Sequence, residues 1–212
     1  MPFYRTFLLV QQQFELRLRL TLGAAPVLAL RVSFTGELGY ELHVPSEFAV
    51  HVYRLIMEAG RDLGIVNAGY RALNSLRMEK GFVLWGSDIT PDYTPHHAGL
   101  SRLVSRKKGN FIGKEAIEWV GHSGADRLLC VFMLNEKVPV FGGEAILRGG
   151  KVLGVTTSGD FGHTIGKPIV YGYIPRDEAG FADYEVEVYG QQVHAVRADA
   201  PLYDPQSMRM RS

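Results

Sequence analysis

Residues 31–45 constrain the fold of this chain more than any other stretch. Apolar and polar residues alternate up to Phe34, the chain then passes Gly36 and Gly39, and the alternation resumes at Tyr40. Two glycines between two alternating runs predict a tight bend between strands, because glycine enters turn conformations without a steric cost. This stretch therefore predicts that an antiparallel sheet is built around its bend.

A carboxylate lies on each side of Gly39, with Glu37 in the bend and Glu41 in the second strand. Successive side chains of a strand point to opposite faces, so Glu41 faces away from the apolar residues that flank it. An acid on a rigid strand beside a glycine bend suits ligand binding, and it also suits a solvated outer face. The pattern alone leaves both interpretations open.

The composition argues against several partners. The chain has 23 Lys and Arg against 22 Asp and Glu and no long basic run, so nothing favours binding to nucleic acid. No apolar stretch approaches the roughly 18 residues of a membrane span, and the apolar part of residues 1–10 is too short for a signal peptide. We therefore expect neither a nucleic-acid partner nor a membrane partner.

The single cysteine, Cys130, lies in an apolar run and excludes an internal disulfide. We expect it to be a buried core residue, since an unpaired cysteine behaves as a small hydrophobic side chain. A reducing, intracellular compartment fits this usage.

The first half of the chain combines strands with helices. Strict alternation predicts strands over 14–22, 27–34 and 40–44, which form a meander with one apolar face. A helix that follows Ser46 and stops at Gly64 is predicted to cover that face, followed by a second helix over 70–80. The remaining predictions of this half are a strand over 82–85, an ordered loop over 86–110 and a helix over 113–120.

The sequence pattern changes in the second half, where short runs separated by glycines replace the mixed strand and helix patterns. Residues 121–126 form the best domain boundary between the two halves. Short apolar or alternating runs punctuated by glycines are typical of a small antiparallel barrel or sandwich. We predict an α+β fold, in which an antiparallel sheet with covering helices precedes a small antiparallel β-barrel. The predicted strands of this half cover residues 127–134, 144–147, 151–157, 168–173, 184–189 and 192–198.

The sequence contains no motif that by itself identifies a catalytic, metal-binding or phosphate-binding site. Asp88, Asp92, His96 and His97 lie close together in the sequence, but their spacing matches neither a zinc site nor a calcium loop, so no metal is predicted. Nothing marks Ser158 as an activated nucleophile. The sequence also contains no phosphate-binding glycine loop.

Three blocks of residues carry a resemblance to a known family. They are Phe34-Thr-Gly-Glu-Leu-Gly-Tyr-Glu-Leu-His43, Ser75-Leu-Arg-Met-Glu-Lys-Gly81 with Trp85-Gly-Ser-Asp-Ile89 and Thr94-Pro-His-His-Ala-Gly-Leu100, and Gly154-Val-Thr-Thr-Ser-Gly159 with Gly166-Lys-Pro-Ile-Val-Tyr-Gly-Tyr-Ile174. In this order they resemble the folate-dependent aminomethyltransferase family, the T-protein of the glycine cleavage system and its relatives, and the resemblance runs from about residue 14 to the end. The short motifs Glu79-Lys-Gly81, Trp85-Gly86, Lys137-Val-Pro-Val-Phe-Gly142 and Asp160-Phe-Gly162 are similar to the C-terminal part of sarcosine and dimethylglycine dehydrogenases.

The resemblance implies three small domains around a central hole that binds tetrahydrofolate, to which a one-carbon unit passes from an aminomethyl or iminium donor. It makes Glu41 the pterin-binding acid, whose carboxylate accepts two parallel hydrogen bonds from the pterin. Phe34 is then expected to stack on the pterin, and Trp85 to line the hole. Arg77 is expected to pair with Glu79 or Glu41. The predicted folate-binding residues are Glu41, Phe34, Arg77 and Trp85.

The resemblance also assigns domains and implies absences. Residues 14–121 correspond to the second half of the folate-binding domain and 122–212 to the C-terminal barrel, while 1–13 stay unassigned. The family's catalytic aspartate lies in a first half that would precede residue 14, so no catalytic residue is predicted here. FAD is expected only if an upstream dehydrogenase domain exists. Such a chain is expected to be a truncated product, a split subunit or a recombinant fragment.

Three functional hypotheses follow, of which the third is a degenerate fragment with no function. The first is a folate-binding domain for one-carbon transfer, inactive alone, whose partners are folate and the missing half or another subunit. The second is a non-catalytic regulatory or binding module on the same fold, since one fold hosts several functions. Phe34, Leu73 and His97 depart from the family's common residues and favour the second. A cytoplasmic location is expected, or the mitochondrial matrix in a eukaryote.

Overall fold

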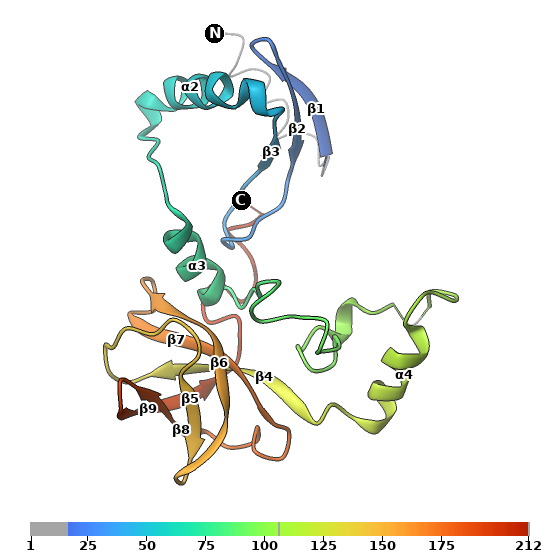
Figure 1. Ribbon diagram of the computed structural model, residues 1–212. Helices are drawn as coiled ribbons and strands as arrows, with labels where there is room; N and C mark the ends of the chain where they lie inside the picture. Colours follow the sequence, from blue (N-terminus) through green and yellow to red (C-terminus); the bar gives the residue numbers. More distant parts are fainter. Residues whose placement is uncertain (1–16, 106, 212) are drawn as a thin grey trace. The chain divides into compact units, whose positions relative to one another are not determined.

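The computed structural model describes residues 17–105 and 107–211, and these form two compact units (Figure 1). Of the described residues, one unit comprises 17–73 with 206–211, and the other comprises 74–105 with 107–205. Each unit has a hydrophobic core of its own. The unassigned segment 1–13 and residues 14–16 of the first predicted strand lie outside the described residues.

A three-stranded antiparallel sheet forms the base of the first unit, in the order β1 (Arg17–Leu22), β2 (Ala25–Leu30) and β3 (Glu41–His43). The turn between β1 and β2 contains Gly23, whose φ is 59°. A Cβ atom at this glycine would lie 2.4 Å from Nε2 of His51. Both the conformation and the space therefore require glycine here. The predicted meander is confirmed.

Strand β2 ends earlier than the alternation predicts, at Leu30 instead of Phe34. The N–H of Val32 donates to the carbonyl of Leu30 at 3.0 Å, and the N–H of Gly36 donates to Oγ of Ser33 at 3.0 Å. Local hydrogen bonds thus replace the sheet ladder after Leu30.

Helix α2 (Ala49–Ala59) follows the 3₁₀ turn η1 (Ser46–Phe48) and packs on the apolar face of this sheet. A second 3₁₀ turn, η2 (Arg61–Leu63), leads to Gly64 in the left-handed conformation. The predicted covering helix is confirmed, although regular α-helix ends at Ala59. The core that it closes contains Leu22, Ala25, Val27 and Val52, with Leu20, Leu42, Val44, Phe48 and Ile56 at its edge.

The second unit begins within helix α3 (Tyr70–Glu79) and continues through irregular chain to η3 (Ser101–Leu103) and α4 (Lys114–Ser123). The strand predicted over 82–85 is wrong. Those residues lead into a turn in which the N–H groups of three later residues, Ser87, Asp88 and Ile89, donate to the carbonyl of Leu84. The apolar residues at 82–85 resemble a strand in sequence. The carbonyl of Leu84, however, accepts hydrogen bonds within the turn and does not pair with a neighbouring strand.

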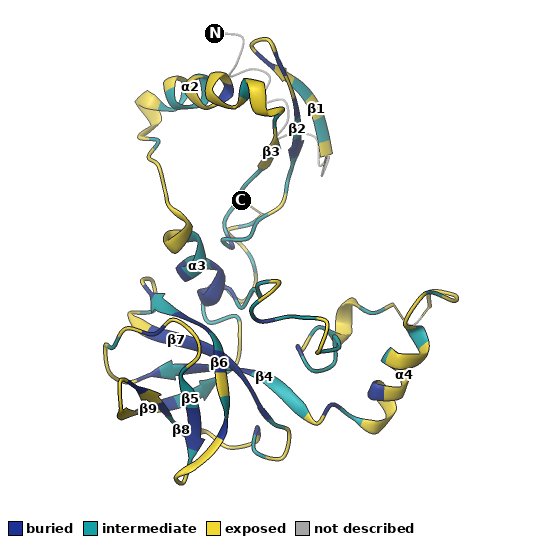
Figure 2. Ribbon diagram, in the orientation of Figure 1, coloured by how far each residue is buried: buried dark blue, intermediate teal, exposed yellow. Residues whose placement is uncertain are grey.

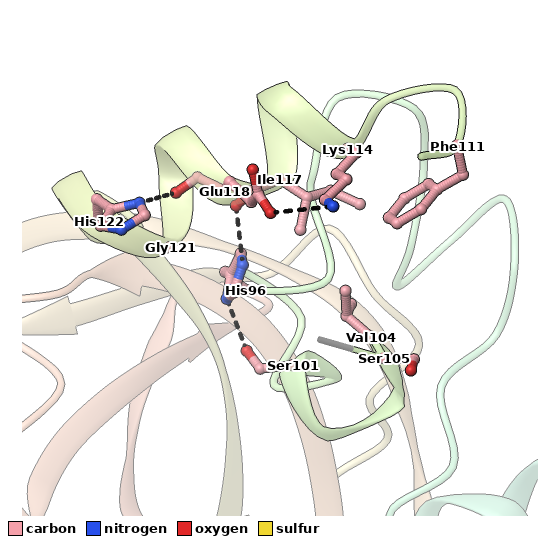
Figure 3. Close-up of a pocket in the computed structure, with 10 residues that line it drawn as sticks. All are labelled: His96, Ser101, Val104, Ser105, Phe111, Lys114, Ile117, Glu118, Gly121 and His122. Carbon is pink, nitrogen blue, oxygen red and sulfur yellow. Dashed lines mark hydrogen bonds and ion pairs between the residues drawn. The ribbon is translucent and has the colours of Figure 1, made fainter. Parts of the chain in front are cut away.

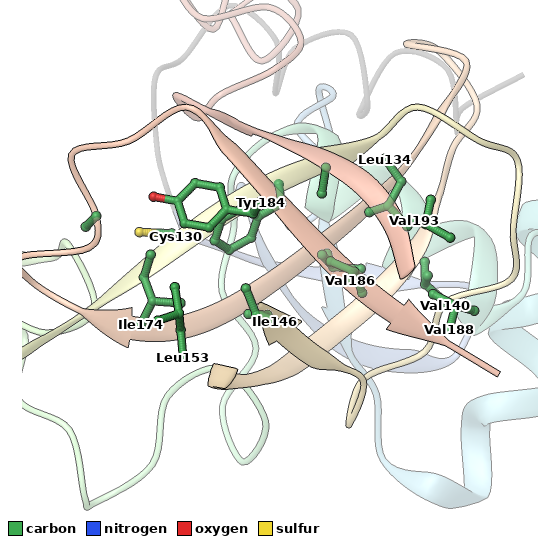
Figure 4. Packing of buried hydrophobic residues seen from close by; sticks show 14 residues of the cluster. Cys130, Leu134, Val140, Ile146, Leu153, Ile174, Tyr184, Val186, Val188 and Val193 are labelled. Atoms are coloured by element: carbon green, nitrogen blue, oxygen red, sulfur yellow. The ribbon is translucent and has the colours of Figure 1, made fainter. Parts of the chain in front are cut away.

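A closed antiparallel barrel follows, with the strand order β4-β7-β6-β5-β8-β9 (Figure 1). Its interior is apolar, as the inward residues in Figure 4 and the buried stretches in Figure 2 show. Phe132 and Tyr184 meet edge to face inside it, with ring centroids 4.9 Å apart. The predicted α+β fold with a small barrel is confirmed. The strands are β4 (Arg127–Leu134), β5 (Ala145–Arg148), β6 (Lys151–Gly162), β7 (Lys167–Pro175), β8 (Asp183–Val188) and β9 (Gln191–Ala198).

Bulges and glycines let the barrel curve closely enough to shut. The pairing register shifts between Thr156 and Ser158 on β6, and such irregularities increase local bend and twist. A Cβ atom at Gly154 would lie 2.1 Å from the carbonyl oxygen of Tyr173 on the neighbouring strand. Close backbone contact at this point therefore requires glycine.

Cys130, on β4, is 3% exposed and belongs to the barrel core, as predicted. In the part of the chain that the structure describes, no helix has both the length and the apolar character to cross a membrane.

The carboxylate of Glu144 holds the chain just before β5. It accepts the N–H groups of Phe141 at 2.7 Å and Gly142 at 2.9 Å, together with the hydroxyl of Thr156. Burial acts to raise the pKa of Glu144, but the donors from Thr156, Phe141 and Gly142 outweigh it and lower the pKa below 4.5. The stability gained this way is present above pH 4.5 and is lost as the pH falls through the folded-state pKa.

Glu144→Gln is therefore expected to lower the melting temperature at pH 7, and the difference from wild type is expected to shrink below about pH 4.5. Circular dichroism melts between pH 7 and pH 3 measure this. Glu187→Gln, at an exposed position of β8, serves as the control. A difference that stays constant over this range would contradict the role of the Glu144 charge.

Candidate functional site

Glu41 begins β3 and faces away from the core of its unit. Its side chain is 60% exposed, and its Oε2 lies 3.7 Å from Nε2 of His43. Leu42, between them, belongs to the edge of the apolar core under α2. The predicted strand phase is thus observed, because the acid points out and its neighbour points in.

The other acid of the bend, Glu37, has a partner within the same unit. Nε of Arg209 lies 2.7 Å from both of its carboxylate oxygens, and the N–H of Leu38 donates to the carbonyl of Arg209 at 3.0 Å. The last residues of the chain therefore hold the bend. Phe34 lies at the start of the bend and is half-buried.

Arg77, on α3 in the second unit, is 1% exposed, and an acceptor faces each of its five N–H donors. Nε and Nη2 donate to Oδ1 of Asn74, both at 2.9 Å, and Nη2 also donates to Oγ of Ser158 at 2.7 Å. Nη1 donates to the carbonyl of Phe82 at 3.0 Å and to Oδ2 of Asp88 at 2.5 Å. Its guanidinium is fully used by the fold.

The ion pair of Arg77 corrects the predicted one, since its carboxylate partner is Asp88. Glu79 instead accepts the N–H groups of Thr164 at 2.6 Å and Ile165 at 3.1 Å, which secures the hairpin between β6 and β7. Asp88 is 0% exposed, so this is a buried ion pair.

Trp85 lies beside this ion pair in the chain, in the turn that follows Leu84, and is 69% exposed. The structure thus places Arg77 and Trp85 in the second unit, and Glu41 and Phe34 in the first. Their assignment to folate stays a prediction.

Sequence reasoning misses the contributions of Asn74, Ser158 and Asp88 to this network. The motifs present Asp88 only as a candidate metal ligand and Ser158 only as a candidate nucleophile. A useful signal exists, because Asp88 and Ser158 fall in two of the three family-like blocks. The register shift next to Ser158 prevents simple alternation from showing which face of β6 it occupies.

The four residues considered for a metal lie in separate hydrogen-bonded settings. Asp88 pairs with Arg77, Asp92 accepts the hydroxyl of Thr90, His96 contacts Ser101, and His97 contacts Asp126. Over residues 17–105 and 107–211 no group of three or more His, Cys, Asp or Glu side chains could hold a metal ion.

In two of these settings the hydrogen-bond donor can be assigned. The N–H of Thr94 donates to Nδ1 of His97, so Nε2 of the ring donates to Asp126 at 3.0 Å. This hydrogen bond lowers the pKa of Asp126. Burial raises the pKa of Tyr173 far above its ordinary value, and its hydroxyl donates to the carbonyl of Asp88 at 2.9 Å.

A pocket of about 590 Å³ lies against α4, and none of the residues that line it is a predicted folate residue (Figure 3). His96 lies at its centre, where Nδ1 is 2.8 Å from Oγ of Ser101 and Nε2 is 3.1 Å from the carbonyl of Ile117. A carbonyl only accepts, so Nε2 carries the proton and Ser101 donates to Nδ1. The ring links η3 to α4. The lining residues are His96, Ser101, Val104, Ser105, Phe111, Lys114, Ile117, Glu118, Gly121 and His122.

Comparison with known families matches both parts of the chain. The description "GCVT N-terminal domain" applies to residues 11–108, and "Glycine cleavage T-protein C-terminal barrel domain" to residues 127–204. The observed barrel strands β4 to β9 fall within the second match.

Individual proteins that are similar to this chain include members of the same family. Human mitochondrial sarcosine dehydrogenase is 42% identical over 87% of this chain, which spans 21% of that protein. The regulatory subunit of mouse mitochondrial pyruvate dehydrogenase phosphatase is 34% identical over 82% of the chain, which spans 22% of it. The crystal structure of glycine cleavage system aminomethyltransferase T from Bartonella henselae superposes with a TM-score of 0.77 at 28% identity, over 84% of this chain and 50% of that one. The chain belongs to the glycine cleavage T-protein family.

Proposed function

We propose that this chain binds tetrahydrofolate through Glu41 and belongs to an enzyme that transfers one-carbon units. The exposed carboxylate of Glu41 on β3 carries the proposal. Of the two acids in the family-like block, Glu37 is held by Arg209, whereas the side chain of Glu41 is 60% exposed, with Nε2 of His43 3.7 Å from its Oε2. Glu41 is therefore the acid that remains available to a ligand.

The chemistry of the pterin suits this position. A carboxylate accepts two parallel hydrogen bonds from a ring N–H and an adjacent amino group, and such charge-assisted pairs are strong and directional. A group on a regular strand is aimed more precisely than one on a loop. Phe34 offers an aromatic face in the same unit.

The reaction of the whole protein is part of the same proposal. The names of the relatives include an aminomethyltransferase and a sarcosine dehydrogenase, which are enzymes. Since the chain spans 21% of one and 50% of the other, it would supply folate contacts, and the catalytic base would come from elsewhere. FAD would belong to a dehydrogenase domain outside this chain. We propose a cytoplasmic location, or the mitochondrial matrix in a eukaryote.

Glu41→Gln is expected to weaken tetrahydrofolate binding at least tenfold, because it removes one acceptor and the charge that strengthens both hydrogen bonds. Calorimetric titration of the 212-residue chain measures the dissociation constant. Glu47→Gln, at another exposed acid of the same unit, is expected to bind like wild type. Equal affinity of Glu41→Gln and wild type would remove Glu41 from the site.

The second candidate function is a non-catalytic regulatory module. The phosphatase regulatory subunit among the relatives supports it, since this protein is named for regulation. A chain that forms a stable dimer and shows no affinity for tetrahydrofolate would favour this module. Recovery of methylene-tetrahydrofolate synthesis when an upstream half of the domain is added would favour the enzyme.

A further inference from the structure

A hollow of about 320 Å³ lies beside β6 of the barrel, and all of its residues belong to the second unit. This volume is at the lower end of the range of ligand pockets, so the hollow suits a small molecule. It shares no lining residue with the pocket at α4, and none of the residues predicted to bind folate lines it. The lining residues are Tyr93, Arg127, Val152, Leu153, Gly154, Val155, Thr157 and Tyr173.

Arg127, the first residue of β4, is half-buried and supplies the charge of this hollow. Its Nη2 donates to the carbonyls of Leu153 at 2.6 Å and Tyr173 at 2.7 Å, which fixes the guanidinium in place. Both hydrogens of Nη2 are thus used, while Nε and Nη1 have no acceptor among the described residues. Over residues 17–105 and 107–211, no acid forms an ion pair with Arg127.

The charge of the lining determines which ligand fits. The eight lining residues carry one positive charge, that of Arg127, and no negative charge. A half-buried cation without a counter-ion loses hydration and gains no attraction in return, so a bound anion is favoured. One negative charge balances the site, whereas a dianion would exceed it. The lining has no acid to pair with an ammonium group, so a ligand that also carries an amine is disfavoured.

The walls of the hollow are apolar. Val152 and Val155, both on β6, are 58% and 56% exposed and line the hollow together. The rings of Tyr93 and Tyr173 also line it, and they stack with their centroids 3.7 Å apart and their planes 9° from parallel. Apolar walls around a single polar group are typical of small-molecule sites, because the walls gain from being covered and the polar group fixes orientation.

The fold holds these walls in position without a ligand. Tyr93 belongs to the turn that contains His97, and Nε2 of His97 donates to Oδ1 of Asp126 at 3.0 Å. The carbonyl of His97 accepts the N–H of Leu129 at 2.9 Å. These two bonds attach the turn to the start of β4, where Arg127 lies. A site that is already formed spends less binding energy on ordering its side chains.

We propose that this hollow binds a small organic monocarboxylate. Its carboxylate accepts hydrogen bonds from Nη1 of Arg127, a charge-assisted contact that a guanidinium makes well. Its apolar body covers Val152 and Val155. The site does not depend on the proposed folate binding, and failure of either proposal leaves the other standing.

The test uses 3-phenylpropionate as the probe and follows the amide signals of the ¹⁵N-labelled 212-residue chain by NMR. Millimolar probe is expected to shift the amide signals of Val152, Gly154 and Val155 in a saturable way. Phenylalanine adds an ammonium group to the same skeleton, and 3-phenylpropanamide lacks the charge, so both are expected to bind roughly tenfold more weakly or worse. An absence of shifts at these amides would overturn the site, and equal affinity for all three compounds would overturn its assignment to a monocarboxylate.

Val155→Asp tests the contact with Arg127. The new carboxylate would compete with the ligand for the guanidinium, so affinity for 3-phenylpropionate is expected to fall roughly tenfold or more. Val155→Asn has the same shape without the charge, and it is expected to lose much less. Leu103→Asp adds a charge at a 70% exposed position that does not line the hollow, and it is expected to bind like wild type.

Arg127→Met removes the charge itself and is expected to abolish binding. Because Arg127 also links β6 to β7, circular dichroism must first show that this variant folds. Val155→Asp, at an exposed position, provides the same test where Arg127→Met does not fold. Affinity equal to wild type in either folded variant would refute the role of Arg127 in the site.

Discussion

Arg77→Met is expected to lower the free energy of unfolding of the second unit by about 3–5 kcal/mol. Methionine fills much of the space but leaves the carboxylate of Asp88 buried at 0% exposure with no counter-charge. It also removes the donors that satisfy Asn74 and the carbonyl of Phe82. A buried charge without a partner is among the few mechanisms that produce effects of this size.

The double variant Arg77→Met with Asp88→Asn tests the electrostatic cause. Asparagine removes the charge and keeps an oxygen that accepts from Leu84, so more than half of the lost stability is expected to return. Urea unfolding followed by circular dichroism measures all three proteins. Arg102→Met, at an exposed position of η3, is the control for loss of an arginine and is expected to change little. No recovery in the double variant would show that packing, and not charge, is the reason.

Gly154→Ala is expected to destabilise the barrel by about 1–3 kcal/mol through overpacking. The added Cβ would lie 2.1 Å from the carbonyl oxygen of Tyr173 and 2.7 Å from Nη2 of Arg127. That nitrogen donates to the carbonyls of Leu153 at 2.6 Å and Tyr173 at 2.7 Å, so the methyl group would push apart a strand pair and its arginine link. The backbone of β7 cannot yield easily, because it also pairs with β4.

Gly180→Ala is the matched control for Gly154→Ala. Among the described residues, no atom outside Gly180 and its two chain neighbours lies within 4 Å of the position of its Cβ, so the same chemical change is expected to alter stability by less than about 0.5 kcal/mol. Thermal unfolding of both variants makes the comparison. Equal melting temperatures for the two would show that the strands separate at Gly154 without cost.

Local periodicity is sufficient for most elements, because strands and helices bury one face each. The strand phase alone places Glu41 on the outer face, and helix α2 lies where its apolar spacing predicts. The same reasoning fails over residues 82–85, where a run of apolar residues forms the entry to a turn. Periodicity reports which face is apolar, and it does not report which backbone groups pair.

The buried hydrogen-bond network around Arg77 shows that local sequence patterns also cannot identify partners that are distant in the chain. Asp88 and Ser158 lie 11 and 81 positions from Arg77 in the chain, and no local pattern links them. Glu79 is the nearer acid in the sequence and therefore the expected partner of Arg77, but the helix turns that acid toward the β6–β7 hairpin.

The sequence by itself determined the α+β class, the order of its elements apart from the strand predicted over 82–85, the outward position of Glu41 and the family to which the blocks point. The first three follow from alternation, helical spacing and glycine positions, which act over a few residues, and the family follows from the resemblance of the three blocks. Only the tertiary structure decided where β2 ends, how the barrel closes at Gly154, and that Arg77 pairs with Asp88 in the turn that carries Trp85. Such features depend on which distant residues the fold brings within hydrogen-bonding distance, and desolvation then makes each of those contacts obligatory.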